Sequence, residues 1–182
     1  MNIIFWNVRG AGSSDFRRIF REVVLMNQPD LVFITETRLS GERANRIIPT
    51  LGFERYIKVD AMGFAGGIWL LWNPERILLE PTGQSFQEIH CLAKVNNHSF
   101  LLSCLYASPI TTKRYKLWDS LAEFAGMHNL PWLLIDLGFS GPLFTWTNNH
   151  QNGTIIRTRI DRAHANQSWL NLFLDSKVYH LP

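Results

Sequence analysis

The chain consists of short apolar runs separated by stretches in which apolar residues recur every three or four positions. The segment over residues 2–8 predicts a first buried strand, and the continuous apolar run over residues 31–34 predicts a second strand, of the kind found in a sheet covered on both faces. Between these runs, apolar residues share one face of a predicted helix from about Phe16 to Met26, which Ser13 or Ser14 can cap. The chain therefore begins as strand, helix and strand, with Glu36 at the end of the second strand.

The same alternation continues along the rest of the chain. Strands are predicted at residues 54–59, 68–72, 86–95 and 99–106, and again in "PWLLI" and "LFTWT". Asn96-Asn97 provides a hairpin turn. A short helix over residues 42–48 is expected to end at Pro49. A longer one from Lys113 to Ala125 is expected to bury Tyr115, Trp118, Leu121, Ala122 and Ala125.

Strands outnumber helices, and hairpins alternate with helical crossovers. This mixture favours an α/β architecture of two packed mixed β-sheets flanked by helices, although the pattern alone leaves other α/β or α+β arrangements open. The 182 residues, 46% hydrophobic and 13% aromatic, contain enough apolar side chain for a sizeable core and exclude a disordered or collagen-like chain. No repeat or low-complexity linker divides the sequence, so residues 1–182 are expected to form a single domain.

Charge and cysteine content narrow the environment of the chain. The 18 basic and 15 acidic residues give a net charge of +3, which weakly favours an anionic partner. Basic residues cluster at Arg9, Arg17, Arg18 and Arg21 and at Arg157, Arg159 and Arg162. We interpret the first cluster as mainly a solvated helix face. Cys91 and Cys104 lie in strand-like stretches and are expected to be buried free thiols. With no secretory signal and no membrane-spanning run, the expected protein is soluble and intracellular, a location compatible with the nucleus.

A series of short motifs carries the candidate chemistry. In chain order these are "WNVRG" with Asn7, "ITETRLS" with Glu36, "GGIWLLW", "LYASP" with Tyr106, "PWLLI", "FTWTN" and "RIDRAHAN" with Asp161. Taken singly, each polar residue has an ordinary explanation. Asn7 is typical of a turn, and Glu36 is typical of an exposed strand end. Tyr106 is typical of a half-buried ring whose hydroxyl contacts water, and Asp161 is typical of a helix cap or a local ion pair.

Together, the motifs resemble the endonuclease/exonuclease/phosphatase superfamily, and most closely the endonuclease domain of plant long-interspersed-element (non-LTR) retrotransposons. The resemblance implies a DNase-I-like four-layer sandwich, a DNA substrate and a Mg²⁺ cofactor. It makes Glu36 the metal ligand with Asn7 beside it. By the same resemblance, Tyr106 contacts the phosphate or orients the nucleophile, and Asp161 orients a terminal histidine. One carboxylate and one amide suit Mg²⁺, which prefers oxygen ligands and keeps several waters.

Two motifs of the family pattern are absent. After "PWLLI" the family carries Gly-Asp-Phe-Asn, and after "HLP" it carries Ser-Asp-His; here Ile135 runs directly into "DLGFSG". We interpret Asp136 as part of the downstream segment, so that a catalytic loop and a helix have been lost by deletion or as an intron. His180 precedes the position of the family histidine, and His90 is expected to be a strand histidine. The fold is accordingly expected to be incomplete, with unpaired sheet edges and marginal stability.

Three hypotheses follow from these departures. The first is a degenerate phosphodiesterase with weak or lost Mg²⁺ binding and little activity, because losing a general base typically costs about 10²–10⁴ in rate. The second is a non-catalytic nucleic-acid-binding domain that uses Arg9, Arg157, Arg159 and exposed aromatic side chains. The third is an active enzyme in which Asp136 replaces the missing aspartate. We favour the first.

Overall fold

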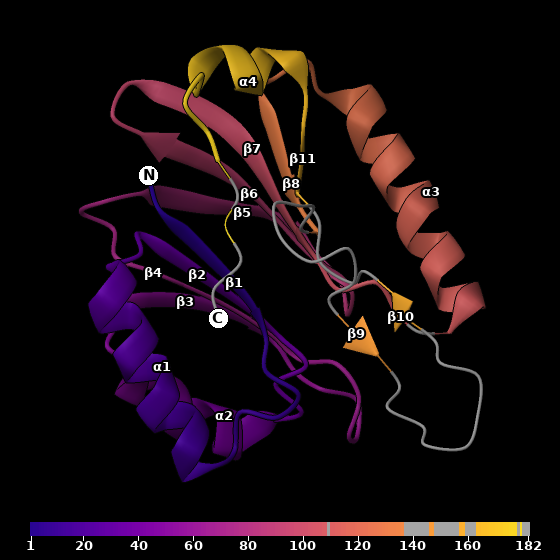
Figure 1. Cartoon of the computed structure of the whole chain (residues 1–182). Helices are drawn as coiled ribbons and strands as arrows, with labels where there is room; N and C mark the ends of the chain where they lie inside the picture. Colours follow the sequence, from indigo (N-terminus) through magenta and orange to yellow (C-terminus); the bar gives the residue numbers. More distant parts are fainter. Residues whose placement is uncertain (109, 137–145, 148–156, 159–162, 178, 180–182) are drawn as a thin grey trace.

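The computed structural model describes residues 1–108, 110–136, 146–147, 157–158, 163–177 and 179. Strands and helices alternate along the chain (Figure 1). Their bounds are β1 Ile3–Asn7, α1 Ser14–Asn27, β2 Leu31–Thr35, α2 Gly41–Ile47, η1 Ile48–Leu51, β3 Arg55–Val59, β4 Ile68–Trp72, β5 Leu78–Gln84, β6 Glu88–Val95, β7 His98–Leu105, α3 Thr111–Met127, β8 Trp132–Ile135, β9 Trp146–Thr147, β10 Arg157–Thr158, β11 Ala163–Ala165 and α4 Gln167–Leu172.

The longer strands form two mixed sheets. The first has the order β1-β2-β4-β3, with β1 parallel to β2 and the other neighbours antiparallel. The second has the order β11-β8-β7-β6-β5, with β7 parallel to β8 and the others antiparallel. Strands β9 and β10 pair separately as a short ribbon. The predicted pairing of two mixed sheets is confirmed.

Three apolar clusters separate four layers. One lies between the sheets and includes Phe33 of β2 and Leu102 of β7. A second lies between the first sheet and helices α1 and α2, and a third lies between the second sheet and α3. Figure 1 shows the resulting order of α1 and α2, first sheet, second sheet and α3. This is the DNase-I-like four-layer arrangement expected from the sequence.

The apolar run of β2 is explained by this layering. Leu31 and Phe33 face the cluster between the sheets, whereas Val32 and Ile34 face the cluster beneath the helices. Because side chains alternate along a strand, a strand buried on both faces needs apolar residues at consecutive positions. Helix α1 begins where Ser13 Oγ accepts a hydrogen bond from the Phe16 amide at 3.0 Å, which confirms one of the two predicted caps.

One prediction about the elements is confirmed and two need correction. The short α-helix does end before Pro49, since α2 ends at Ile47, and Pro49 lies in the first turn of the 3-10 helix η1, where its missing N–H costs no helical hydrogen bond. Strand β5 was not predicted, since Pro81 and Gly83 interrupt its pattern; the edge position of β5 and a register shift between Pro81 and Gly83 accommodate both residues.

The second correction concerns the buried face of α3. Leu121 is buried as predicted, but Tyr115, Trp118, Ala122 and Ala125 are exposed. The helix packs through Leu117 and Leu121 instead, against residues at the ends of β7 and β8. Two overlapping stripes satisfy the helical period in this segment, and the sheet beneath selects the aliphatic one.

Cys91 and Cys104 are buried and free, as predicted. Burial raises the pKa of Cys91 to about 12 and that of Cys104 well above its usual value, so both thiols stay protonated at neutral pH. None of the helices in the described residues is long and apolar enough to cross a membrane.

Candidate functional site

Two parallel strands bring the principal candidate residues to one edge of the first sheet. Asn7 is the last residue of β1 and pairs in register with Thr35, the last residue of β2. Glu36 follows immediately, so both polar side chains leave the sheet at the same level. The adjacent loops stay in register beyond the strands, because the Val8 amide donates to the Thr35 carbonyl and the Ala11 amide to the Thr37 carbonyl, at 3.1 and 2.9 Å.

The side chains of this edge converge on the Glu36 carboxylate. Asn7 Nδ2 donates to Glu36 Oε1 at 3.2 Å, and Arg38 Nη2 contacts Glu36 Oε2 at 3.0 Å. Asn7 Oδ1 is buried and has no hydrogen-bond partner among the described residues. The predicted proximity of Asn7 and Glu36 is therefore present. The contact between Arg38 and Glu36 was not predicted. The position of Arg38, two residues after Glu36 in the sequence "ETR", could have indicated it.

An unusual backbone holds Glu36 in this place. Glu36 and Arg38 have φ angles of 52° and 54°, in the left-handed region that non-glycine residues seldom adopt. Strain of this kind persists only where the surroundings fix the chain. Here the Thr37 and Arg38 amides donate to the carbonyls of Gly67 and Gly66, at 3.2 and 3.0 Å. These glycines precede β4 and begin the motif "GGIWLLW".

Gly66 and Gly67 both have a positive φ, and neighbouring atoms leave little room for a side chain at either position. A Cβ atom on Gly67 would lie 2.2 Å from Oγ1 of the buried Thr37 and 3.3 Å from the Arg38 amide nitrogen. A Cβ atom on Gly66 would lie 3.3 Å from Cε1 of Tyr106. The glycine pair thus brings β4 against the segment that carries Glu36, and it makes room for the tyrosine.

Tyr106 reaches the site from the second sheet. It follows β7, is half-buried, and its ring lies against Gly66. Burial raises the pKa of Tyr106, and the negative charge of Glu36 adds to this effect, while Arg38 opposes it. A phenol with a raised pKa remains a hydrogen-bond donor at neutral pH. Tyr106 therefore shares one electrostatic environment with Glu36 and Arg38.

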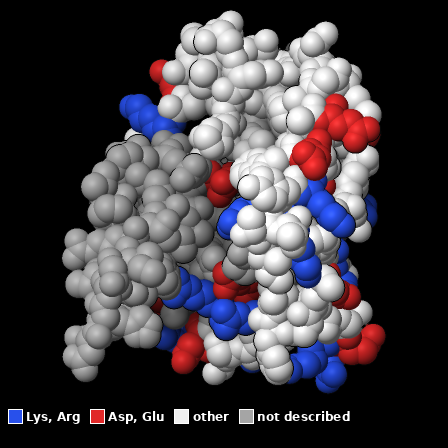
Figure 2. All heavy atoms as spheres, turned by 90° about the vertical axis from the view of Figure 1, so that its right-hand side faces the viewer, with Lys and Arg blue, Asp and Glu red and all other residues white. Residues whose placement is uncertain are grey.

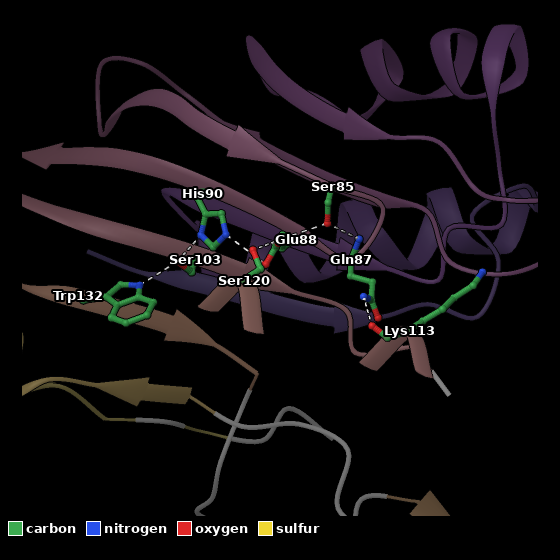
Figure 3. Close-up of polar contacts among 8 residues, drawn as sticks. All are labelled: Ser85, Gln87, Glu88, His90, Ser103, Lys113, Ser120 and Trp132. Atoms are coloured by element: carbon green, nitrogen blue, oxygen red, sulfur yellow. Dashed lines mark hydrogen bonds and ion pairs between the residues drawn. The ribbon is translucent and has the colours of Figure 1, made fainter. Parts of the chain in front are cut away.

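Gln87 holds the loop that carries Tyr106, a role that the sequence did not indicate. Its backbone carbonyl accepts from the Tyr106 amide at 2.7 Å. Its buried side chain accepts from the Ser108 amide at 2.9 Å and donates to the Lys113 carbonyl at 2.8 Å. Figure 3 shows the side chain of Gln87 directed toward the first turn of α3. One amide side chain thereby fixes both the end of β7 and the start of the helix.

A second polar cluster lies beneath α3 (Figure 3). Ser103 Oγ is 2.7 Å from Nδ1 of His90, and Trp132 Nε1 donates to the same Oγ at 2.8 Å. Nε2 of His90 is 3.2 Å from Oε2 of Glu88, whose Oε1 accepts from Ser120 at 2.9 Å.

This serine–histidine–glutamate chain has no access to a substrate. Ser103, His90 and Glu88 are all buried, and Phe124 of α3 stacks on the His90 ring with a centroid distance of 4.3 Å. Burial acts to raise the pKa of Glu88, but hydrogen bonds from His90 and Ser120 outweigh it, so the pKa lies below its usual value. The cluster joins α3 to the sheet, in agreement with the prediction of a strand histidine.

Several predicted residues lie elsewhere or outside the described residues. Asp161, Arg159 and His180 lie outside them, as does the side chain of Arg157. Asp136 directly follows β8, and the parallel register of Cys104 with Ile135 places it level with Leu105, one residue before Tyr106. Asp136 is held by other contacts of its own. Whether it acts in catalysis stays an open hypothesis.

Two of the described residues have the chemistry of metal ligands. Glu36 offers a half-buried carboxylate, and the unpartnered Oδ1 of Asn7 offers a second oxygen. Such a pair fits Mg²⁺, which often binds through one or two carboxylates together with waters and a substrate phosphate. No group of three acidic, histidine or cysteine side chains that could share a cation occurs in the part of the chain that the structure describes. A cation at Glu36 would compete with the Arg38 contact for the carboxylate.

The sequence matches no protein-family model, and no curated protein is significantly similar to it. Solved structures are similar in fold. D. rerio TDP2 complexed with a single-strand DNA product is 15% identical, with a TM-score of 0.64, over 90% of this chain and 82% of that chain. An endonuclease/exonuclease/phosphatase family protein from Bacteroides thetaiotaomicron is 15% identical, with a TM-score of 0.58, over 91% and 80%.

The human Nocturnin catalytic domain, with bound sulfate, is 14% identical, with a TM-score of 0.51, over 74% of this chain and 63% of that chain. At such low identities the likeness concerns architecture, and it agrees with the sheet order and layers described above. The chain has the two-sheet sandwich fold of the endonuclease/exonuclease/phosphatase proteins.

Proposed function

We propose that the chain is a degenerate metal-dependent phosphodiesterase domain, of the DNA-endonuclease type and of retrotransposon origin, with little or no activity. The observation that carries this proposal is the contact of Asn7 with Glu36 at the shared end of β1 and β2. The likeness of the fold to that of an endonuclease/exonuclease/phosphatase family protein supports phosphodiester hydrolysis as the reaction class. The retrotransposon origin rests only on the motif series of the sequence.

In this proposal Glu36 and Asn7 hold Mg²⁺. A bound Mg²⁺ would neutralise charge on a phosphate and lower the pKa of a coordinated water. Tyr106 would donate a hydrogen bond to a phosphoryl oxygen, since its raised pKa keeps the hydroxyl protonated. No group of three acidic, histidine or cysteine side chains that could share a cation forms around Glu36 among the described residues. A nucleophilic water would thus lack a base, and the metal would be held weakly.

Plasmid nicking and metal binding test the proposal together. We expect Mn²⁺ or Mg²⁺ to bind weakly, and we expect Glu36→Gln to abolish that binding in calorimetric titrations. Supercoiled plasmid should be nicked at close to the background rate with or without Mg²⁺. Rapid Mg²⁺-dependent nicking that Glu36→Ala abolishes would contradict the loss of activity. If Asp136→Asn also abolished that nicking, the hypothesis that Asp136 replaces the missing aspartate would gain support.

A non-catalytic nucleic-acid-binding domain is the alternative. It is favoured by Arg9, which is exposed and makes no side-chain hydrogen bond or ion pair with another described residue. On the face shown in Figure 2, however, basic and acidic side chains are interleaved rather than gathered in one stripe. Nucleic-acid affinity that falls steeply with salt and ignores Mg²⁺ would favour this alternative.

A further inference from the structure

The turn formed by residues 61–66 projects an aromatic ring into solvent beside the Glu36 site. Phe64 is 92% exposed, more than any other large hydrophobic side chain among the described residues. It makes no ring contact with another described aromatic side chain. Burying a phenylalanine fully is worth about 1.5–3 kcal/mol, and this ring contributes almost none of that to the fold.

The 61–66 turn is nevertheless held firmly. The amides of Met62 and Ala65 each donate to the other residue's carbonyl, at 3.0 and 3.3 Å, and Gly63 between them has a φ of 63°. The Ala61 amide donates to the Leu39 carbonyl at 3.1 Å. At the other end, the Gly66 carbonyl accepts from the Arg38 amide. Both ends of the turn are therefore attached to the segment that carries Glu36.

Two arginines lie on the backbone segments to which this turn is connected. Arg38 extends from the strand end to which the turn is bonded, and its side chain is 43% exposed. Arg9 lies on the neighbouring loop, whose amides bond to Thr35 and Thr37. An exposed aromatic ring together with arginines near a phosphate-directed centre is the combination with which proteins bind single-stranded nucleic acid.

We propose that Phe64 is a stacking platform for an unpaired nucleobase of a nucleic acid whose backbone lies along Arg38 and Arg9. This inference rests on the proposed function for the position of the phosphate, but it requires neither turnover nor a metal ion. The base must be unpaired because in a duplex its faces are covered by neighbouring bases. A protein partner is a poorer fit, because a single ring at a narrow turn offers far less than the roughly 800 Å² per partner of a stable interface.

The test is the affinity for an oligothymidylate of about 10 nucleotides, measured by fluorescence anisotropy in EDTA. Phe64→Ala should weaken binding about 10-fold, whereas Phe64→Tyr should retain it, since stacking on one ring is worth roughly that factor. Met26→Ala is the matched control, because Met26 is 84% exposed at the end of α1, and it should bind as the unaltered protein does. An abasic oligomer of equal length should bind equally to the Phe64→Ala variant and the unaltered protein.

Stacking has a direct signature as well. A 2-aminopurine base in the oligomer should lose fluorescence on binding to the unaltered protein, and the loss should be smaller with Phe64→Ala. Equal affinity of Phe64→Ala and the unaltered protein for oligothymidylate would overturn the inference, as would an equal loss on the abasic oligomer. Self-association that Phe64→Ala abolishes would assign the turn to a second copy instead.

The metal site at Glu36 and the stacking platform at Phe64 can be contradicted independently of each other. Glu36→Gln should remove metal binding and leave affinity for oligothymidylate in EDTA unchanged or slightly higher. Absence of any oligonucleotide binding would overturn the stacking platform, while calorimetry with Mn²⁺ would still decide the metal site.

Discussion

At the Glu36 carboxylate, a divalent cation has to compete with an arginine. Both carboxylate oxygens are engaged, one by Asn7 and the other by Arg38. The Glu36 side chain is only 24% exposed, so solvent and salt screen its charge less than they screen that of a surface carboxylate. The strength of a metal site at this edge is therefore set by the residue two positions after Glu36 as well as by Glu36 itself.

Replacing Arg38 with alanine is expected to strengthen metal binding. Its removal frees Oε2 and deletes a positive charge next to the cation, and we expect Mn²⁺ affinity to rise about 3- to 10-fold, an electrostatic effect of roughly 1 kcal/mol. Electron paramagnetic resonance of free Mn²⁺ measures this affinity. Arg9→Ala is the control, since it removes the same charge nearby without touching Glu36, and its effect should be smaller. Equal effects of the two substitutions would mean that only net charge matters.

Gly67 tests the backbone that presents Glu36. Gly67→Ala introduces a Cβ into contact with buried Thr37, whereas Gly63→Ala places one in open space; both glycines have positive φ. We expect Gly63→Ala to cost about 1–2 kcal/mol of unfolding free energy from backbone strain. Gly67→Ala should cost about 1–3 kcal/mol more because of the overlap. Urea unfolding followed by tryptophan fluorescence measures both, and similar losses would contradict the packing assigned to Gly67.

Among the elements, α3 depends on a polar contact for its attachment. Apolar contacts to the helix are restricted to Leu117, Leu121 and a few neighbours, whereas Ser120 bonds to Glu88 and Phe124 stacks on His90. Since Gln87, the residue before β6, also bonds to the Lys113 carbonyl, hydrogen bonds join the helix at Lys113 and Ser120 to the start of β6. The attachment of α3 should therefore respond to the protonation of Glu88, which is paired with His90 beneath the helix.

Acidification is expected to loosen α3. Glu88 has a folded-state pKa below its unfolded value, so its contribution is complete above the unfolded pKa, which is about 4.3, and is lost as the pH falls through the folded pKa. Unfolding free energy should decrease below about pH 4, and Glu88→Gln should be less stable at pH 7 with a flatter acid limb. Glu123→Gln, at an exposed position of the same helix, should leave the curve unchanged. An unaltered acid limb in Glu88→Gln would refute this role.

At the scale of the whole molecule, the facing edges of the sheets leave a groove. Strand β1 ends the first sheet and β11 ends the second, as far as the described residues go. The groove between them has a volume of about 1870 Å³, and its lining includes Phe5, Leu133 and Leu170. The lining also includes polar residues such as Asn27 and Lys177. The apolar part of an opening of this size should make the protein prone to aggregation.

Binding of an apolar dye such as ANS provides the measurement. The folded protein should enhance ANS fluorescence at pH 7, and Leu170→Lys should reduce the enhancement by placing a charge in the groove. Leu130→Lys is the matched control, because Leu130 is exposed to a similar extent, 41% against 42%, and does not line the groove. Both variants should unfold at the same urea concentration. Equal ANS binding by Leu170→Lys and Leu130→Lys would mean that the dye binds outside the groove.

Much of this architecture could be predicted from sequence because the information is local. The double-sided burial of β2, the cap at Ser13 and the turn at Asn96-Asn97 follow from the order of a few residues. The errors occurred where a local pattern had two solutions. Helix α3 offers two apolar stripes, and the sheet decides between them. Strand β5 contains proline and glycine that only an edge position tolerates.

For the candidate site, the sequence by itself determined which groups are present: Asn7 and Glu36 at two strand ends, Tyr106 at a third, and a glycine pair before β4. Tertiary structure alone decided that the two parallel strands end in register, that Arg38 takes one oxygen of Glu36, and that Phe64 stands exposed beside them. The physical reason is that the pattern of side chains fixes which residues are buried, whereas the distance between atoms on different strands depends on register, crossover and layer packing.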